Sequence, residues 1–174
     1  MQESIFNEQI KNYTDYVEKA LEMGADTAVR FEIEDIFFDS RVVLKCMFGC
    51  KDYAVHTQKS ALSIDDYRNI LQKYKWGIII GCEDETVTQN ISIEIERACV
   101  FDGYYLALSL RDCCLCKKCN KANFKECRYP QQTRPSFHTV GIDILKTVRN
   151  LGLPYEIIQN EYNTKYCYAA VFIE

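Results

Sequence analysis

Five cysteines lie within 15 residues near the middle of the chain, in the segment CCLCKKCNKANFKEC from Cys113 to Cys127. Apolar side chains over residues 111–135 follow neither the helical nor the strand period. A loop of this length therefore has no hydrophobic face to hold it in place. Cysteines at this density in an irregular, basic segment indicate a metal site rather than ordinary core packing.

Whether cysteines form disulfides or remain as thiols depends on the cellular compartment. The chain carries ten cysteines among 174 residues, and its first residues show neither the basic start nor the apolar run of a secretory signal. We therefore expect a cytoplasmic protein, in which thiols stay reduced. The longest apolar stretches, Trp76–Ile80 and Tyr168–Ile173, are too short to span a bilayer, so no membrane association is expected.

The spacing within the segment selects four candidate ligands. Beginning at Cys113, it reads C-x2-C-x2-C-x7-C, which makes the candidates Cys113, Cys116, Cys119 and Cys127. Four thiolates suit either tetrahedral zinc or an iron–sulfur cluster. Two successive two-residue gaps favour a [4Fe-4S] cluster, as in bacterial ferredoxins, whereas zinc sites more often use two separated C-x2-C pairs. Cys114 is the weaker alternative to Cys113, because it would give C-x-C with Cys116.

The segment is also basic in an acidic chain. Residues 111–134 hold seven Lys or Arg and two acids, a charge of +5 in a chain of −4, so the remainder carries −9. Cations near an anionic thiolate cluster stabilise it and tune its potential. They would equally attract an acidic protein, which suggests a redox or enzyme partner. Nucleic-acid binding is not expected, because the chain is acidic overall and few aromatic side chains interleave with the basic ones.

Cys46 and Cys50 form a weaker feature. Their C-x3-C spacing resembles the opening of the radical-SAM motif, but the third position of that motif holds Tyr53, which excludes the motif. The pair could be a dithiol, half of a metal site, or two core thiols. Three further cysteines lie on apolar faces and are expected to pack in the core: Cys82, Cys99 and Cys167.

Apolar periodicity predicts helices and strands outside the cysteine segment. Helices are expected over 3–23, over 64–74 behind a capping box at Ser63, over 85–101 and over 136–151. Residues 104–110 fit either a helix or an alternating strand, and a helix is favoured because Gly103 is the only breaker. Strands are expected over 27–34, 41–46, 76–81 and 166–173. In the helix over 85–101, the apolar face contains Ile91 and Ile95, with Glu94 and Glu96 facing elsewhere.

This alternation predicts an α/β or α+β fold. We expect a single layered domain over 1–174, with a central mixed β-sheet, flanking helices and a cysteine-rich metal-binding loop at 111–135. The sequence shows no Gly-rich phosphate loop, nucleophile elbow or zinc-protease motif, so no catalytic residue is assigned.

Four motifs in order resemble a known family. They are FDGYYLALSL at 101–110, CCLCKKC at 113–119, CRYP at 127–130 and RPSFHTVGIDI at 134–144. Together they resemble the predicted metal-binding proteins named domain of unknown function 2284, over about residues 41–153. The resemblance assigns the family's cysteine motif to Cys113, Cys116, Cys119 and Cys127. It also draws attention to Arg128, Pro130, Pro135, Ser136, Gly141 and Asp143.

The chain departs from the family pattern in two places. Relatives carry C-P-P after the Cys46, Cys50 and Tyr53 positions, where this chain has Lys-Ser-Ala at 59–61. If the N-terminal cysteines form a second site in relatives, one ligand is missing here. Position 138 is His where relatives often carry an acid.

Three functions follow from these patterns. The first is a protein that uses an iron–sulfur cluster for electron transfer or in support of a partner enzyme. The second is a structural zinc module for protein contacts. The third is an enzyme with an open iron at Cys127, for which Cys114, His138 or Asp143 would be acid/base or thiol candidates.

Overall fold

The computed structural model describes residues 15–49, 62–117, 119, 127–158 and 163–174. Its centre is a four-stranded sheet in the order β1 (Thr27–Glu32), β2 (Trp76–Cys82), β6 (Cys167–Phe172) and β3 (Leu108–Leu110). Every pairing in this sheet is antiparallel. Two short strands, β4 (Ile157–Ile158) and β5 (Asn163–Thr164), form a separate antiparallel pair.

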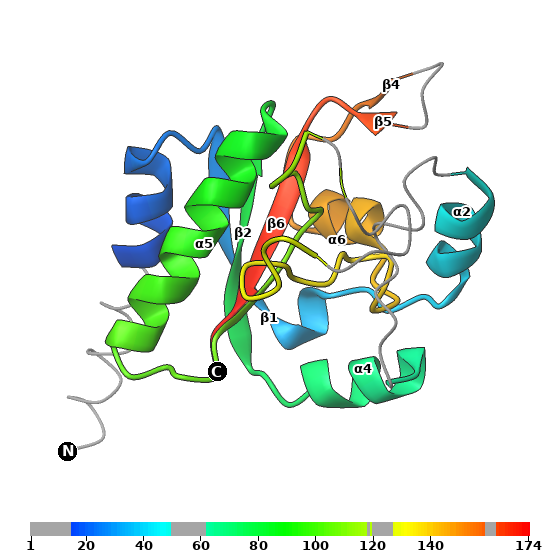
Figure 1. Ribbon diagram of the computed structural model, residues 1–174, viewed down its shortest axis with the longest axis horizontal. Coiled ribbons are helices and arrows are strands. Elements are labelled where there is room, and N and C mark those ends of the chain that lie inside the picture. Colours follow the sequence, from blue (N-terminus) through cyan, green and yellow to red (C-terminus); the bar gives the residue numbers. More distant parts are fainter. Residues whose placement is uncertain (1–14, 50–61, 118, 120–126, 159–162) are drawn as a thin grey trace.

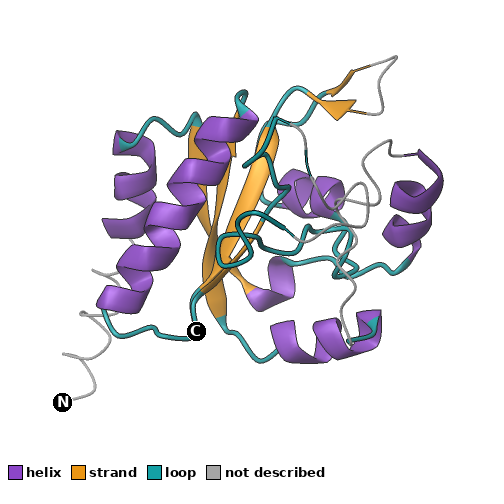
Figure 2. Cartoon of the chain, viewed as in Figure 1, coloured by secondary structure: helices purple, strands orange, loops and turns teal. Residues whose placement is uncertain are grey.

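Helices cover both faces of the sheet (Figures 1 and 2). A helix over 15–22 and the long α5 (Glu85–Phe101) lie on one face. On the other side lie α4 (Ile64–Leu71) and α6 (Ile144–Asn150), with α2 (Arg41–Gly49) farther out and a short 3-10 turn, η1 (Ile33–Asp35), after β1. The predicted layered α/β architecture is confirmed, and its central sheet is antiparallel rather than mixed.

The core consists of two apolar clusters, one on each face of the sheet. Successive side chains of a strand point to opposite faces. Ile78 and Ile80 of β2 therefore pack with Ile91 and Ile95 of α5. Ile79 packs on the opposite side, in a cluster with Phe31, Phe172, Leu71 and Val148. All seven residues of β2 are buried, as its continuous apolar run predicts.

The elements with strong local signals form as predicted. The α5 helix spans Glu85–Phe101, and the Asp84 carboxylate caps it by accepting hydrogen bonds from the backbone amides of Thr86 and Val87. At α4, the Ser63 side chain and Asp66 form the expected reciprocal capping box. The β6 strand lies within the predicted range 166–173. Residues 3–14 of the first predicted helix lie outside the described residues.

Three predicted elements are wrong. Residues 41–46, predicted as a strand, form the first part of α2. The Asp39 carboxylate accepts a hydrogen bond from the Arg41 amide, which favours a helical turn at this point. Tertiary context overrides the strand propensity of Val42 and Val43. Over 104–110 the favoured helix is wrong and the strand alternative is confirmed for the last three residues. A turn is followed by β3, since Gly103, at φ 101°, ends α5 in a left-handed conformation.

The third correction concerns residues 136–151. Ser136 caps only a turn, accepting a hydrogen bond from the Thr139 amide, and Ile142 then bridges to Phe38. The helix itself begins later, at α6, with Asp143 as its cap. The β1 strand also ends earlier than predicted, at Glu32. In the described part of the chain, no helix combines the length and apolar character that a membrane crossing requires.

Candidate metal centre

The cysteine-rich loop begins directly after β3 and returns to its own starting point. The backbone amide of Arg111 donates to the Pro135 carbonyl at 3.1 Å. The Arg111 guanidinium also donates to the Gln132 carbonyl at 2.7 Å. We call Arg111, Gln132, Arg134 and Pro135 the loop neck. The neck holds the two ends of the loop together beside the sheet, independently of any group bound inside the loop.

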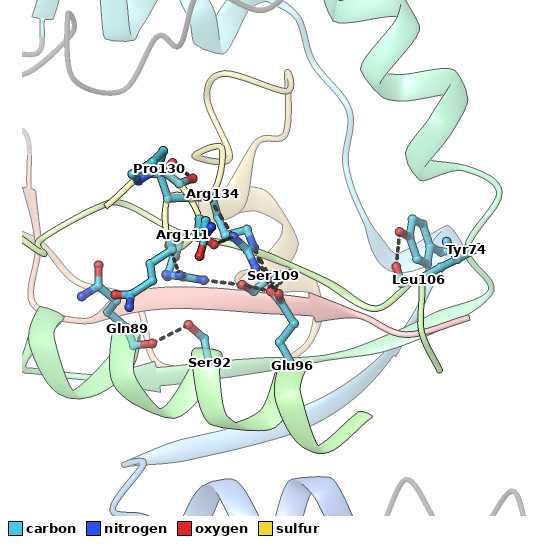
Figure 3. Close-up of polar contacts among 12 residues, drawn as sticks. Tyr74, Gln89, Ser92, Glu96, Leu106, Ser109, Arg111, Pro130 and Arg134 are labelled. Carbon is cyan, nitrogen blue, oxygen red and sulfur yellow. Dashed lines mark hydrogen bonds and ion pairs between the residues drawn. The ribbon is translucent and has the colours of Figure 1, made fainter. Parts of the chain in front are cut away.

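A buried carboxylate of α5 fastens this neck to the body of the protein (Figure 3). Glu96 accepts hydrogen bonds from the Ser109 amide at 2.7 Å and from Arg134 Nε, 3.1 Å from each of its carboxylate oxygens. Burial alone would raise the pKa of Glu96, but the hydrogen bonds from Arg134 and Ser109 outweigh it and hold the pKa below its usual value. Glu96 is therefore ionised at neutral pH.

The second guanidinium of the neck is more deeply buried. Arg111 is 2% exposed and donates to the Ser109 hydroxyl, which in turn bonds Glu96. Burial and the charge of Arg134 lower the pKa of Arg111 to about 10, against the opposing effects of Glu96, Cys113 and Cys114. Arg111 thus stays protonated at neutral pH.

The described cysteines of the loop are partly buried. Burial is the main reason that the pKa of Cys113 is raised, and the nearby Cys119 and Cys127 thiols raise it further. Three of the four predicted ligands are therefore electrostatic neighbours. The Cys127 sulfur also accepts a hydrogen bond from the Tyr129 amide at 3.3 Å. Hydrogen bonds of this kind stabilise a metal-bound thiolate.

The loop does not present a finished coordination sphere. Within the ranges that the structure describes, no three Cys, His, Asp or Glu side chains converge closely enough to hold a metal ion. The donor set itself is entirely sulfur at the predicted positions, which fits zinc or an iron–sulfur cluster. Metal binding at this loop would require the thiols to draw together, while the neck stays closed.

Cys114 has its own partners on α5. Its amide donates to Gln89 Oε1 at 3.0 Å, and its thiol lies 3.6 Å from the Glu85 carbonyl. Burial and the Glu85 carboxylate raise the pKa of Cys114 to about 11. The thiol of Cys167 lies nearby, since Cys114 contributes to its raised pKa. The two adjacent cysteines thus differ: Cys114 is bonded to a helix, and Cys113 lies near other loop thiols.

A comparison with protein families places this loop in context. Residues 29–173 match the family model described as predicted metal-binding protein (DUF2284). The chain belongs to this family. The match extends beyond the 41–153 range that the motifs suggested, and it takes in most of β1 and all of β6. No curated protein and no solved structure matches the chain.

Other residues singled out by the DUF2284 motifs have local structural contacts. The Asp143 carboxylate accepts from the Lys146 amide at 2.9 Å as the cap of α6. His138 is partly buried in the turn before α6, where its carbonyl accepts from the Gly141 amide. Arg128 and Pro130 are exposed. The structure gives these residues no role in holding a metal.

The second cysteine pair is only partly described. Cys46 is buried, 6% exposed, in α2. Its predicted companion Cys50 lies outside the described residues, as do Tyr53 and the Lys-Ser-Ala at 59–61. The dithiol, metal-site and core-thiol interpretations of the pair remain predictions. Cys82 and Cys99 are buried core residues as expected, whereas Cys167 is partly exposed.

Sequence reasoning missed the residues that anchor the loop. Glu96 was expected to face away from the apolar side of α5, but it is buried there, 9% exposed. Its position four residues after buried Ser92 and three before buried Cys99 places it on the inward face. That spacing was the available signal. Its partners Ser109 and Arg134 come from distant segments, so the spacing alone could not identify the network.

Proposed function

We propose that the loop over 111–135 binds a [4Fe-4S] cluster through Cys113, Cys116, Cys119 and Cys127, for electron transfer or in support of a partner enzyme. The observation that carries this proposal is the closed neck: the Arg111 amide donates to the Pro135 carbonyl, so all four cysteines lie in one loop whose ends are joined. Membership of a predicted metal-binding family supports the metal itself.

The chain's own residues would prepare this site in two ways. The neck fixes the ends of the loop, so that the cysteines lie between two joined ends before a metal binds. The Tyr129 amide donates to the Cys127 sulfur and would stabilise it as a thiolate. When bound, an iron–sulfur cluster supplies one-electron chemistry, at a potential set by hydrogen bonds and nearby charge.

A protein partner follows from the charge of the loop. Lys117 and Arg128 are exposed at the loop surface. Over residues 111–134 the sequence carries +5, within a chain that is otherwise acidic. We propose that an acidic surface of a redox or enzyme partner docks here, because complementary charge steers such encounters.

Zinc is the second candidate, and the donor set is the observation that favours it. Four cysteines without a further ligand match a closed structural zinc site. The third function, an enzyme with an open iron, has less support. Two of its three candidate groups already have structural contacts: the Cys114 amide donates a hydrogen bond to Gln89 of α5, and the Asp143 carboxylate caps α6.

Anoxic isolation tests the proposal. We expect a brown protein with about four iron and four sulfide per chain. The Cys116→Ser variant should lose the colour, while Cys82→Ala, a matched change in buried β2, should keep it. A colourless protein with about one zinc per chain would contradict the cluster and support a structural zinc site. A folded protein free of any metal would overturn metal binding at this loop.

A further inference from the structure

The charges of the loop neck do not balance among themselves. Arg134 forms an ion pair with Glu96, and their side chains are 23% and 12% exposed. Arg111 is a second guanidinium in the same network, reached from Glu96 through the Ser109 hydroxyl. Two cations therefore share one carboxylate, which leaves a charge of +1 in a buried network (Figure 3).

The surplus charge belongs to Arg111. Among the described residues, its guanidinium donates to two neutral oxygens, the Ser109 hydroxyl and the Gln132 carbonyl. A buried cation with neutral partners is costly unless an anion lies near it. The thiols of Cys113 and Cys114, which can become anionic, follow Arg111 by two and three residues and act on it electrostatically together with Glu96.

A metal–thiolate centre would supply the missing negative charge. Four thiolates around one Zn²⁺, or around a [4Fe-4S]²⁺ core, carry a net charge of about −2. Cys113, the first predicted ligand, follows Arg111 by two residues at the point where the loop leaves the neck. The charge match is therefore the same for either metal.

We propose that the buried Arg111 guanidinium is the counter-charge of the metal–thiolate centre, and that Glu96 positions it through Ser109. Arg134 has a different role: it neutralises Glu96 and attaches the C-terminal end of the loop to α5. The inference rests on the proposed metal binding by the loop, and it holds for zinc as well as for a cluster. Arg111 is a positioning and electrostatic residue and does not ligate the metal.

The test uses Co²⁺ as a probe, because its absorption reports thiolate coordination. Reduced, metal-free full-length protein is titrated with Co²⁺ against a competing chelator under anoxia. Arg111→Met removes the charge and leaves the Arg134–Glu96 pair intact, whereas Arg111→Lys keeps the charge. Arg97→Met is the control, since Arg97 lies on α5 next to Glu96 in the sequence but forms an exposed pair with Glu94.

We expect Arg111→Met to weaken Co²⁺ binding at least about tenfold, with Arg111→Lys and Arg97→Met within about threefold of the parent protein. The thiolate-to-cobalt bands of the loaded variants should be unchanged, because the ligands are unchanged. Equal affinity for Arg111→Met and the parent would overturn the counter-charge. Equal weakening by Met and Lys would also overturn it, because it would show a role in packing alone.

Folding and metal binding are separated in the same experiment. Thermal unfolding of the metal-free variants reports whether each one folds, and Arg111→Gln, which retains a hydrogen-bond donor, replaces Arg111→Met if the latter does not fold. Failure of both neutral variants to fold would contradict the proposal, which assigns the charge to metal binding. If the parent protein itself binds no Co²⁺, the proposed function fails first and takes this inference with it.

Discussion

The backbone amide of Arg111 donates to the carbonyl of Pro135, and this bond joins the two ends of a loop that carries half of the protein's cysteines. Because of this bond, the loop leaves the sheet and returns at the same place, and hydrogen bonds to Glu96 attach it to α5. A metal bound by the cysteines of this loop would leave the neck and the sheet as they are. Stability of the body and loading of the loop are therefore separable quantities.

Replacing Glu96 tests the anchor. Glu96→Gln leaves the partly buried Arg134 and the buried Arg111 without their carboxylate, and we expect it to lower the free energy of unfolding by about 2 kcal/mol or more. Glu94→Gln on the same helix removes only an exposed pair with Arg97 and should cost less than about 0.5 kcal/mol. Denaturant unfolding of the metal-free proteins measures both. Equal effects of the two changes would contradict a buried anchor.

Acid should weaken the same anchor. The pKa of Glu96 is lowered in the folded protein, so its contribution to stability is present above the ordinary glutamate pKa of 4.5 and is lost as pH falls through the lower folded value. The difference in unfolding free energy between the parent and Glu96→Gln should therefore shrink below about pH 4.5. Urea titrations of both proteins between neutral and acid pH measure this difference. A difference that stays constant down to acid pH would show that the ionised carboxylate is not what stabilises the neck.

The turn before α6 should be sensitive to a side chain at Gly141. This residue has φ 77°, and an added Cβ would lie 2.7 Å from Ile64 Cγ2 of α4. Gly152 has a similar φ of 69° but nothing within 4 Å of the added atom. We expect Gly141→Ala to cost about 1–3 kcal/mol and more than Gly152→Ala, because strain and a clash act together. Thermal unfolding compares the two variants, and a Gly152→Ala change that costs as much would remove the argument for close contact with α4.

Elements whose signals are local could be predicted from the sequence. Asp84 and the spacing of Ile91 and Ile95 define α5, and an unbroken apolar run defines β2. Residues 41–46 were predicted wrongly, because the choice between strand and helix depends there on a cap at Asp39 and on packing rather than on propensity. The helix expected over 104–110 was wrong for a related reason, since pairing with β6 decides the structure of that segment.

The candidate site also has a part that the sequence predicts and a part that it does not. Cysteine spacing identifies ligand positions, because it depends on residues close together in the sequence. The neck that holds them depends on Glu96, Ser109 and Arg134, which come from three separate segments. Ser109 and Arg134 lie in two of the family motifs, but no periodicity or spacing pairs either of them with Glu96. A charged residue on the apolar face of a helix, such as Glu96, is the local sign that such a network exists.

One pair of variants tests the central claim most directly. Cys113→Ser and Cys114→Ser change adjacent residues, of which the account makes the first a ligand and the second a contact of α5. Metal content per chain after anoxic isolation should fall sharply in Cys113→Ser and stay near the parent value in Cys114→Ser. Metal lost from Cys114→Ser and retained by Cys113→Ser would contradict the assigned ligand set, and a parent protein isolated without metal would contradict the site itself.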